Sequence, residues 1–414
     1  MKKIGALNLG LAFAGCFLGA GYVSGQELWQ FFGSFGTKGA VGLAIAMAVL
    51  FGVGILMLDL NRISGIADID KLVVRWNIPI LRAAVTVLEL LFLFGVCTIM
   101  SAGAGALLNQ LFGIPTTLGS AALAALVAYV SLAGLGGMVA AFSATVPVLA
   151  VVTLVFGIIS VSQNGVQFTQ PAAAGSNPLM GSWVVAALSF ACYNTFGNIA
   201  MISPLGEFMK SKKAAVCGIA VGAAVLVVIA GSVLLSISAR PSLSDAELPM
   251  LALAQSKGKA VGIIYGVLLL LAMFGTALSN LVGFTSIIFR KSKRIKSYKT
   301  LFTVACAAAT VCGSLVGFGD LIGKLALRER DNSDKHFLEF DVTVIALDGF
   351  VDKRPNLLAA VFGGGAQAAQ ESHGGQILGL CFLLGGFSGY VSCAVSYERI
   401  HSGVIAPISL PGKS

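Results

Sequence analysis

A run of small and polar residues interrupts the first apolar stretch of the chain, and these residues are the best candidates for chemistry. Three glycines lie there within seven positions, and glycine lowers the free energy of leaving helical geometry. Ser24 and Glu27 have the spacing of a capping box, in which the two side chains bond free backbone N–H groups at a helix start. We therefore predict that one helix ends and another begins inside the apolar layer. The predicted substrate-binding residues of this segment are Gly19, Ala20, Gly21, Tyr22, Ser24, Gly25 and Gln26.

A second polar, glycine-containing stretch at residues 193–198 interrupts a later apolar block. Pro204 follows it, and proline suits the first turn of a helix but disrupts a helix interior. We predict a second break here, while the alternative is a set of ordinary hydrogen-bonding groups between packed helices. The predicted substrate-binding residues of this stretch are Tyr193, Asn194, Thr195 and Asn198.

Broken helices can bind a solute without any ionisable side chain. Their unpaired N–H groups carry partial positive charge and can hold a carboxylate, while their unpaired carbonyls can hold a cation. Glu27 adds an ionisable group at membrane depth, which makes it the candidate for carrying the coupling ion. The alternative is that Glu27 is a structural cap, and the two roles can coexist. Glu89, with Arg82 seven residues before it, is interpreted as half of a structural ion pair on one helix face.

The composition places these segments in a membrane. Of the 414 residues, 57% are hydrophobic and only 11% are charged, whereas soluble domains carry about 25% charged residues. The apolar residues form ten continuous blocks of the length that crosses a bilayer as a helix, and their continuity excludes a barrel. We therefore predict an all-α polytopic membrane protein. The ten blocks are residues 4–35, 39–60, 79–112, 117–136, 138–162, 181–209, 212–238, 259–289, 299–323 and 374–396.

The basic residues predict the orientation of these helices. With the N-terminus in the cytoplasm, fourteen lysines and arginines fall on the cytoplasmic side and four in the first four external loops, as the positive-inside rule requires. The net charge of +9 is therefore assigned to orientation and not to nucleic-acid binding. No metal ligands are assigned, because the eight cysteines and three histidines show no ligand spacing.

The chain divides into three regions by polarity. Residues 1–324 form a transporter-like core of nine helices, and residues 374–414 contain a tenth helix and a short tail. The intervening residues 325–373 hold eight of the 18 acidic residues. This polar segment is interpreted either as a long external loop or as a disrupted region.

The two predicted breaks lie in the first and sixth of ten helices, which are equivalent positions of two five-helix halves. Paired interrupted segments of this kind indicate the binding site of a secondary transporter. The run from Gly19 to Glu27, followed by Phe31 and Phe32, resembles the first-helix signature of the bacterial YkvI-type membrane proteins. Residues 317–322 are similar as well, and the likeness extends to about residue 324.

That resemblance implies the LeuT-like, amino acid–polyamine–cation transporter fold. It implies ten core helices in an inverted five-plus-five repeat, with helices one and six interrupted and a central site between them. A cation site shared between the first break and helix eight is also implied. Ser279 and Asn280 are polar positions of helix eight, but no motif singles them out.

These observations predict an ion-coupled secondary transporter of a small solute such as an amino acid, working by alternating access. The alternative is a membrane sensor or scaffold on the same fold that transports nothing. An enzyme is not expected and no catalytic residues are assigned, because the chain shows no HExxH, GxSxG or Walker motif. No cofactor is expected beyond Na⁺ or H⁺ as coupling ion. The expected partners are the solute and the lipid bilayer of the bacterial inner membrane, and the oligomeric state is left open.

Overall fold

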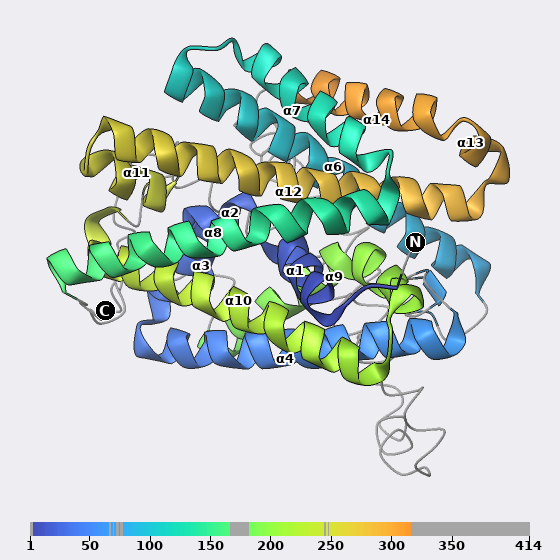
Figure 1. Ribbon diagram of the computed structural model, residues 1–414, viewed down its shortest axis with the longest axis horizontal. Coiled ribbons are helices and arrows are strands. Elements are labelled where there is room, and N and C mark those ends of the chain that lie inside the picture. Colours follow the sequence, from blue (N-terminus) through green and yellow to red (C-terminus); the bar gives the residue numbers. More distant parts are fainter. Residues whose placement is uncertain are drawn as a thin grey trace, which may run out of the picture.

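The computed structural model describes residues 3–65, 68, 70–71, 74, 78–165, 182–243, 246 and 248–315. The predicted polar segment at 325–373, the tenth helix at 374–396 and the motif at 317–322 lie outside these residues. Within the described part the chain is helical apart from short connections. Figure 1 shows the helices lying along the long axis of a bundle, with the N-terminus and α13 (Lys293–Ser297) at one end and α11 (Pro249–Ser256) at the other.

The helices reproduce the first nine predicted blocks. The first block comprises α1 (Ala6–Phe17), α2 (Ala20–Ser24) and α3 (Gln26–Phe31), followed by the 3₁₀ turn η1 (Gly33–Phe35). The next four blocks are α4 (Thr37–Ser64), α6 (Pro79–Phe112), α7 (Thr116–Ser131) and α8 (Gly134–Asn164). The last four are α9 (Trp183–Leu205), α10 (Lys212–Ser238), α12 (Lys259–Lys291) and α14 (Lys299–Ser314), with short 3₁₀ turns η2 (Gly206–Phe208) and η3 (Pro241–Leu243) between them.

Six of the described helices are long and apolar enough to cross a membrane, namely α4, α6, α8, α9, α10 and α12. Three shorter apolar helices, α1, α7 and α14, accompany them. The outer face of α8 exposes a row of large apolar side chains, including Val151, Val155 and Ile158. A surface of this kind is stable against lipid and not against water, so the chain is a membrane protein.

The helix pairs that pack together follow the pattern of an inverted repeat. The most extensive packing joins α1 to α10, that is helix one to helix seven, and joins α4 to α9, helix two to helix six, almost as extensively. In an inverted repeat, helix one corresponds to helix six and helix two corresponds to helix seven. Under this correspondence, the pair of helices one and seven becomes the pair of helices six and two. The contacts of α6 with α14 and of α12 with α7 exchange in the same way. The halves therefore interlock, as the predicted five-plus-five architecture requires.

The crossing of α1 over α10 depends on three glycines. A Cβ atom added at Gly10 would lie 2.4 Å from the carbonyl oxygen of Gly218, and one added at Gly222 would lie 2.5 Å from the carbonyl oxygen of Gly10. Small residues at such a crossing let two backbones touch, which is how helices pack tightly in lipid. This crossing fixes α1 against α10 just before the first helix is interrupted.

The predicted break at residues 193–198 is wrong, because α9 runs without interruption from Trp183 to Leu205. The polar side chains of this stretch bond within the helix: the Asn194 and Asn198 amides donate to carbonyls four residues earlier, at 3.0 and 2.9 Å. Gly197 lies against the ring of Phe92, which a Cβ atom would approach to 2.9 Å. The polar side chains of this stretch therefore do not unwind the backbone, and the helix ends only after Pro204.

A candidate substrate and ion site at the interrupted first helix

The first helix is broken between α1 and α2, as predicted. Leu18 has φ −78° and ψ 74°, and the Gly19 N–H donates to the Phe17 carbonyl at 2.9 Å, which is an inverse γ-turn. Gly19 then continues in extended geometry, with ψ 174°. Because the Gly19 N–H points to Phe17, the carbonyl of Gly15 loses its helical donor. A carbonyl dipole is thereby freed inside the bundle.

A second interruption follows at Gly25, and it corrects the predicted capping box. Gly25 adopts the left-handed conformation with φ 82° and precedes α3, which has no side-chain cap. Ser24 ends α2, where its hydroxyl donates to the Gly21 carbonyl at 3.3 Å and accepts from the Gln26 N–H at 3.4 Å. The left-handed turn moves the helix start past Ser24, so the hydroxyl does not reach the N–H of Glu27.

The Glu27 carboxylate reaches across to α9. The Asn194 amide donates to Glu27 Oε1 at 3.5 Å, and the Tyr193 side chain bonds to the same carboxylate. A Cβ atom at Gly21 would lie 2.9 Å from Glu27 Oε2, so a larger residue there would displace the carboxylate from this position. The two clusters singled out in the sequence, in the first and sixth helices, therefore meet at Glu27.

Aromatic rings surround this meeting point. The Tyr193 ring is parallel to that of Phe31, with centroids 6.4 Å apart, and Phe190 packs edge-on against Phe31 and Phe32 at 5.3 and 4.9 Å. Thr195 is 2% exposed, and its hydroxyl has no hydrogen-bond partner within the described part of the chain. The site thus combines a carboxylate, amides and aromatic faces in a closed setting.

One predicted binding residue also makes a contact that holds the helices together. The Tyr22 hydroxyl donates to the Leu226 carbonyl of α10 at 2.8 Å, and the side chain is 1% exposed. Its polar group is therefore engaged in holding α2 against α10. Ala20 is buried as well, while Gln26 is partly exposed.

Helix α12 supplies polar groups that sequence reasoning missed or did not assign. Tyr265 donates to the Val23 carbonyl at 2.7 Å and so fixes the end of α2. The Thr276 hydroxyl lies 3.2 Å from where a Cβ atom of Gly19 would stand, directly beside the first break. Asn280 donates to the Thr276 carbonyl at 2.7 Å, and its own Oδ1 is buried with no partner among the described residues.

Nothing in the sequence pattern distinguishes Tyr265 or Thr276 from other polar residues of an apolar helix. Asn280 carried a signal, since an amide in the middle of a membrane helix needs a partner. The resemblance implied a cation site here between the first break and helix eight. Hydroxyl, amide and carbonyl oxygens are the donors that hard cations prefer, and the described residues show no cluster of acidic, cysteine or histidine ligands.

The predicted pairing of Glu89 with Arg82 is wrong, since Glu89 makes no ion pair within the described part of the chain. Arg82 instead contacts the Val74 carbonyl at 3.5 Å, and the charges that act on Glu89 include Arg290 and Asp68. Seven residues along a helix bring two side chains to one face, but these two groups turn toward the neighbouring loop and α12.

That loop is tied to α12 by ion pairs. Arg290 meets Asp68 at 2.7 Å, and Lys71 meets it at 3.1 Å. Burial raises the pKa of Asp68, but the hydrogen bond and charge of Arg290, together with those of Lys71, outweigh burial and leave its pKa below the usual range. A third pair joins Lys291 to Asp70 at 3.3 Å. This end of α12 is therefore held by charge, outside the apolar layer.

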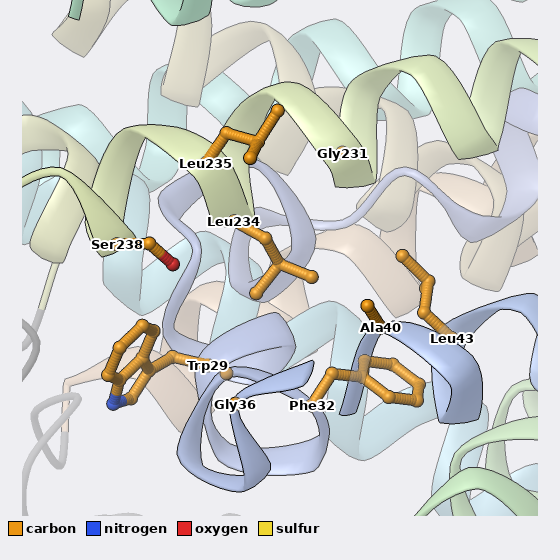
Figure 2. A pocket seen from close by; sticks show the side chains of 10 residues that line it. Trp29, Phe32, Gly36, Ala40, Leu43, Gly231, Leu234, Leu235 and Ser238 are labelled. Carbon is orange, nitrogen blue, oxygen red and sulfur yellow. The ribbon is translucent and has the colours of Figure 1, made fainter. Parts of the chain in front are cut away.

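An apolar cavity of about 230 Å³ lies beyond the site, between α3, the start of α4 and α10 (Figure 2). Trp29, Phe32 and Leu234 point into it from opposite walls (Figure 2). None of the predicted substrate-binding residues lines it. The described residues that line it are mostly apolar and include no charged side chain.

Comparison with known proteins confirms the predicted resemblance and the LeuT-like all-α fold, while the count of ten helices stays a prediction. No family model matches the chain. Two Bacillus subtilis (strain 168) proteins are similar: the uncharacterized membrane protein YkvI, 26% identical over 339 residues, covering 78% of this chain and 92% of that protein, and the uncharacterized protein YyaD, 26% identical over 322 residues, covering 76% and 90%.

Three solved structures share the fold. They are a Na⁺-coupled sialic acid symporter (TM-score 0.58, 15% identity, 98% of this chain and 92% of that one), the nucleobase-cation-symport-1 family transporter Mhp1 (0.55, 16%, 96% and 92%), and MhsT in complex with L-phenylalanine (0.53, 16%, 96% and 99%). At such identities the likeness shows the fold alone, which is the predicted LeuT-like one. None of the three is described as an enzyme, in agreement with the sequence expectation.

Proposed function

We propose that this chain is an ion-coupled secondary transporter of a small solute such as an amino acid, working by alternating access in the bacterial inner membrane with its N-terminus in the cytoplasm. The observation that carries the proposal is the partly buried contact of Glu27 with Asn194 beside the interrupted first helix. It joins the only carboxylate of that helix to the sixth helix, and LeuT-like transporters are expected to bind their solute between these two helices.

The residues around the contact suit a small zwitterion. Amides and free backbone groups offer hydrogen bonds to a carboxylate and an ammonium group, and the Phe31 and Tyr193 rings offer an apolar face. The closed packing of Phe31, Phe32 and Phe190 means that access requires the bundle to move. Rocking of one group of helices against the other around a fixed site is the motion that this architecture supports.

Two sets of groups suit the two candidate coupling ions. Glu27 can take up and release a proton, because it is an ionisable group inside the bundle. The Gly15 carbonyl without its helical donor, the Thr276 hydroxyl beside Gly19 and the unpartnered Asn280 Oδ1 are neutral oxygens of the kind that suits Na⁺. Proton coupling predicts uptake driven by a proton gradient, whereas Na⁺ coupling predicts uptake driven by a Na⁺ gradient.

The test begins with a thermal-shift screen of amino acids and organic cations against the purified protein, with and without Na⁺. A bound ligand raises the unfolding temperature by mass action. The stabilising solute is then used for uptake into proteoliposomes under an imposed Na⁺ or proton gradient. Gradient-dependent uptake supports the proposal, whereas binding without flux under either gradient favours the sensor alternative.

Variants identify the coupling ion. If a proton is coupled, Glu27→Gln abolishes pH-dependent uptake, while Glu89→Gln, the same change at a second buried carboxylate, retains it. If Na⁺ is coupled, Asn280→Leu raises the Na⁺ concentration for half-maximal uptake at least about tenfold, because it removes one ligand oxygen worth about 1.4 kcal/mol or more. Uptake that neither variant alters contradicts the placement of the site.

A further inference from the structure

A polar cavity of about 580 Å³ lies away from the candidate site, where three segments meet at one end of the bundle. The N-terminal segment, the end of α4 and the link between α9 and α10 form its walls. The Ile4 N–H donates to the Phe208 carbonyl at 2.8 Å, which ties the first segment to the third. The lining residues are Lys3, Asn61, Arg62, Gly65, Gly206, Glu207, Met209, Lys210 and Ser211.

The charge of this cavity is positive. Lys3, Arg62 and Lys210 line it, against the single carboxylate of Glu207, so three positive charges and one negative leave a net of two positive. The three basic side chains are exposed and form no ion pair with any residue that the structure describes. The neighbouring Lys212, in contrast, is neutralised by an acidic residue of α4 at 2.8 Å. The positive charge of the cavity is therefore only partly balanced, by Glu207.

The buried side-chain amide of Asn61 lines the cavity and has no hydrogen-bond partner among the described residues. Its side chain is 1% exposed, yet neither Nδ2 nor Oδ1 forms a hydrogen bond within the described residues. A buried amide without partners costs about 1–3 kcal/mol per group, and native structures rarely leave one unsatisfied. Gly206 makes room for it, since a Cβ atom there would stand 2.8 Å from Asn61 Oδ1. The amide is thus held where an occupant of the cavity can bond to it.

We infer that this cavity binds a phosphate-bearing anion. Lysine and arginine side chains are the usual partners of phosphate oxygens, and the Asn61 amide adds a neutral donor. The start of the 27-residue helix α10, with Ser211 as its N-cap, adds the positive end of a helix dipole. The anion is either the headgroup of an anionic phospholipid or a free phosphorylated molecule, since both present the same oxygens.

The position of the cavity gives the bound anion a consequence for the fold. Lys3 belongs to the segment that leads into α1, Arg62 to the end of α4 and Lys210 to the link between α9 and α10. An anion that contacts all three would hold these segments together. It therefore stabilises the arrangement of these three segments, independently of what the central site transports.

The test uses the full chain in nanodiscs and two probes. One arm compares phosphatidylcholine discs with discs containing about 30% phosphatidylglycerol, and native mass spectrometry counts the retained anionic lipid. The other arm titrates inorganic pyrophosphate into phosphatidylcholine discs and follows the unfolding temperature. Stabilisation in the first arm assigns the headgroup, and stabilisation in the second assigns a free phosphate. No stabilisation in either arm overturns the inference.

Matched variants separate a built site from general charge attraction. We expect the triple variant Lys3→Gln, Arg62→Gln and Lys210→Gln to bind the stabilising probe at least about tenfold more weakly. The control triple Lys293→Gln, Arg294→Gln and Lys296→Gln removes the same charge from exposed α13 and should change binding less than about twofold. Equal losses in the two triples refute the site.

A variant that removes a negative charge from the cavity completes the test, because it should strengthen binding and so cannot be explained by a destabilised protein. Glu207→Gln removes the only acidic group among the described residues that line the cavity. It should therefore tighten binding of the same probe severalfold at low salt, where exposed charges are least screened. The unfolding temperature of each variant without probe shows that it is folded. Unchanged or weaker binding in Glu207→Gln contradicts the inference.

Discussion

Gly25→Ala should destabilise the protein by about 2–5 kcal/mol, because two penalties act at one position. Gly25 has φ 82°, a conformation that disfavours a Cβ atom by roughly 1–2 kcal/mol. The added atom would also lie 2.3 Å from Ile237 Cδ1 and 2.8 Å from Val233 Cγ1 of α10. Forcing an atom into a packed core costs about 1–3 kcal/mol more. Unfolding in mixed detergent micelles, followed by circular dichroism, measures the change.

A matched variant isolates the packing contribution. Gly65 also has positive φ, 65°, but nothing lies within 4 Å of its Cβ position, so Gly65→Ala should cost only the roughly 1–2 kcal/mol of conformational strain. Ile237→Val removes the closest clashing atom at a cost of about 0.5–1.5 kcal/mol. Combined with Gly25→Ala, it should destabilise less than the two single changes added together. If Gly25→Ala and Gly65→Ala lose the same stability, α3 does not pack against α10 as described.

Three further outcomes follow from other contacts. Tyr265→Phe should lower the free energy of unfolding by about 1–2 kcal/mol, because it leaves the buried Val23 carbonyl without its donor. Gly10→Ala should lower the free energy of unfolding by about 1–3 kcal/mol, because the added Cβ atom would clash with the Gly218 carbonyl oxygen of α10. Asp68 has a lowered pKa in the folded state, so its contribution is present above its unfolded pKa of about 4 and is lost as the pH falls through the folded value. Asp68→Asn should therefore destabilise at pH 6 and much less at pH 3.

Each of these outcomes has a control of the same chemistry. Tyr298 is 65% exposed, so Tyr298→Phe should leave stability unchanged. Gly95 has nothing within 4 Å of its Cβ position, and Gly95→Ala should be neutral or slightly stabilising in a helix. A loss at Tyr298 or Gly95 equal to that at the buried positions would contradict the contacts. A pH-independent effect of Asp68→Asn would contradict the ion pair with Arg290.

The helices were predictable because their physical signal is long and redundant. Twenty apolar residues in a row allow one solution in lipid, and glycine clustered with polar residues at 19–25 marked the first break correctly. At residues 193–198 the same kind of signal was misleading. Amide side chains such as that of Asn194 can bond to the carbonyl of the preceding turn, so polarity inside an apolar block does not by itself require the backbone to unwind.

The candidate site was predictable in outline and not in its contacts. Sequence placed Glu27 and Asn194 in equivalent helices of two halves, which brought them to one region. It could not show that Tyr22 bonds to α10 or that Tyr265 reaches Val23, because a single tyrosine in an apolar helix has no periodicity. The partners in these two contacts are separated by 204 and 242 positions in the sequence. Such contacts depend on how the helices rotate against each other, and local sequence does not encode that rotation.

Because the two halves interlock, the first half must wait during synthesis for the helices against which it packs. The partner of Glu27 is 167 residues further along the chain, and a ribosome adding about 5–20 residues per second needs roughly 8–33 s to reach it. During that interval the first five helices are in the membrane while α9 and α10, against which α4 and α1 pack, do not yet exist. Glu27 and Gly10 then lack their partners on α9 and α10. The nascent first half consequently depends on the insertion machinery to shelter it, and a fragment ending before residue 183 should be degraded.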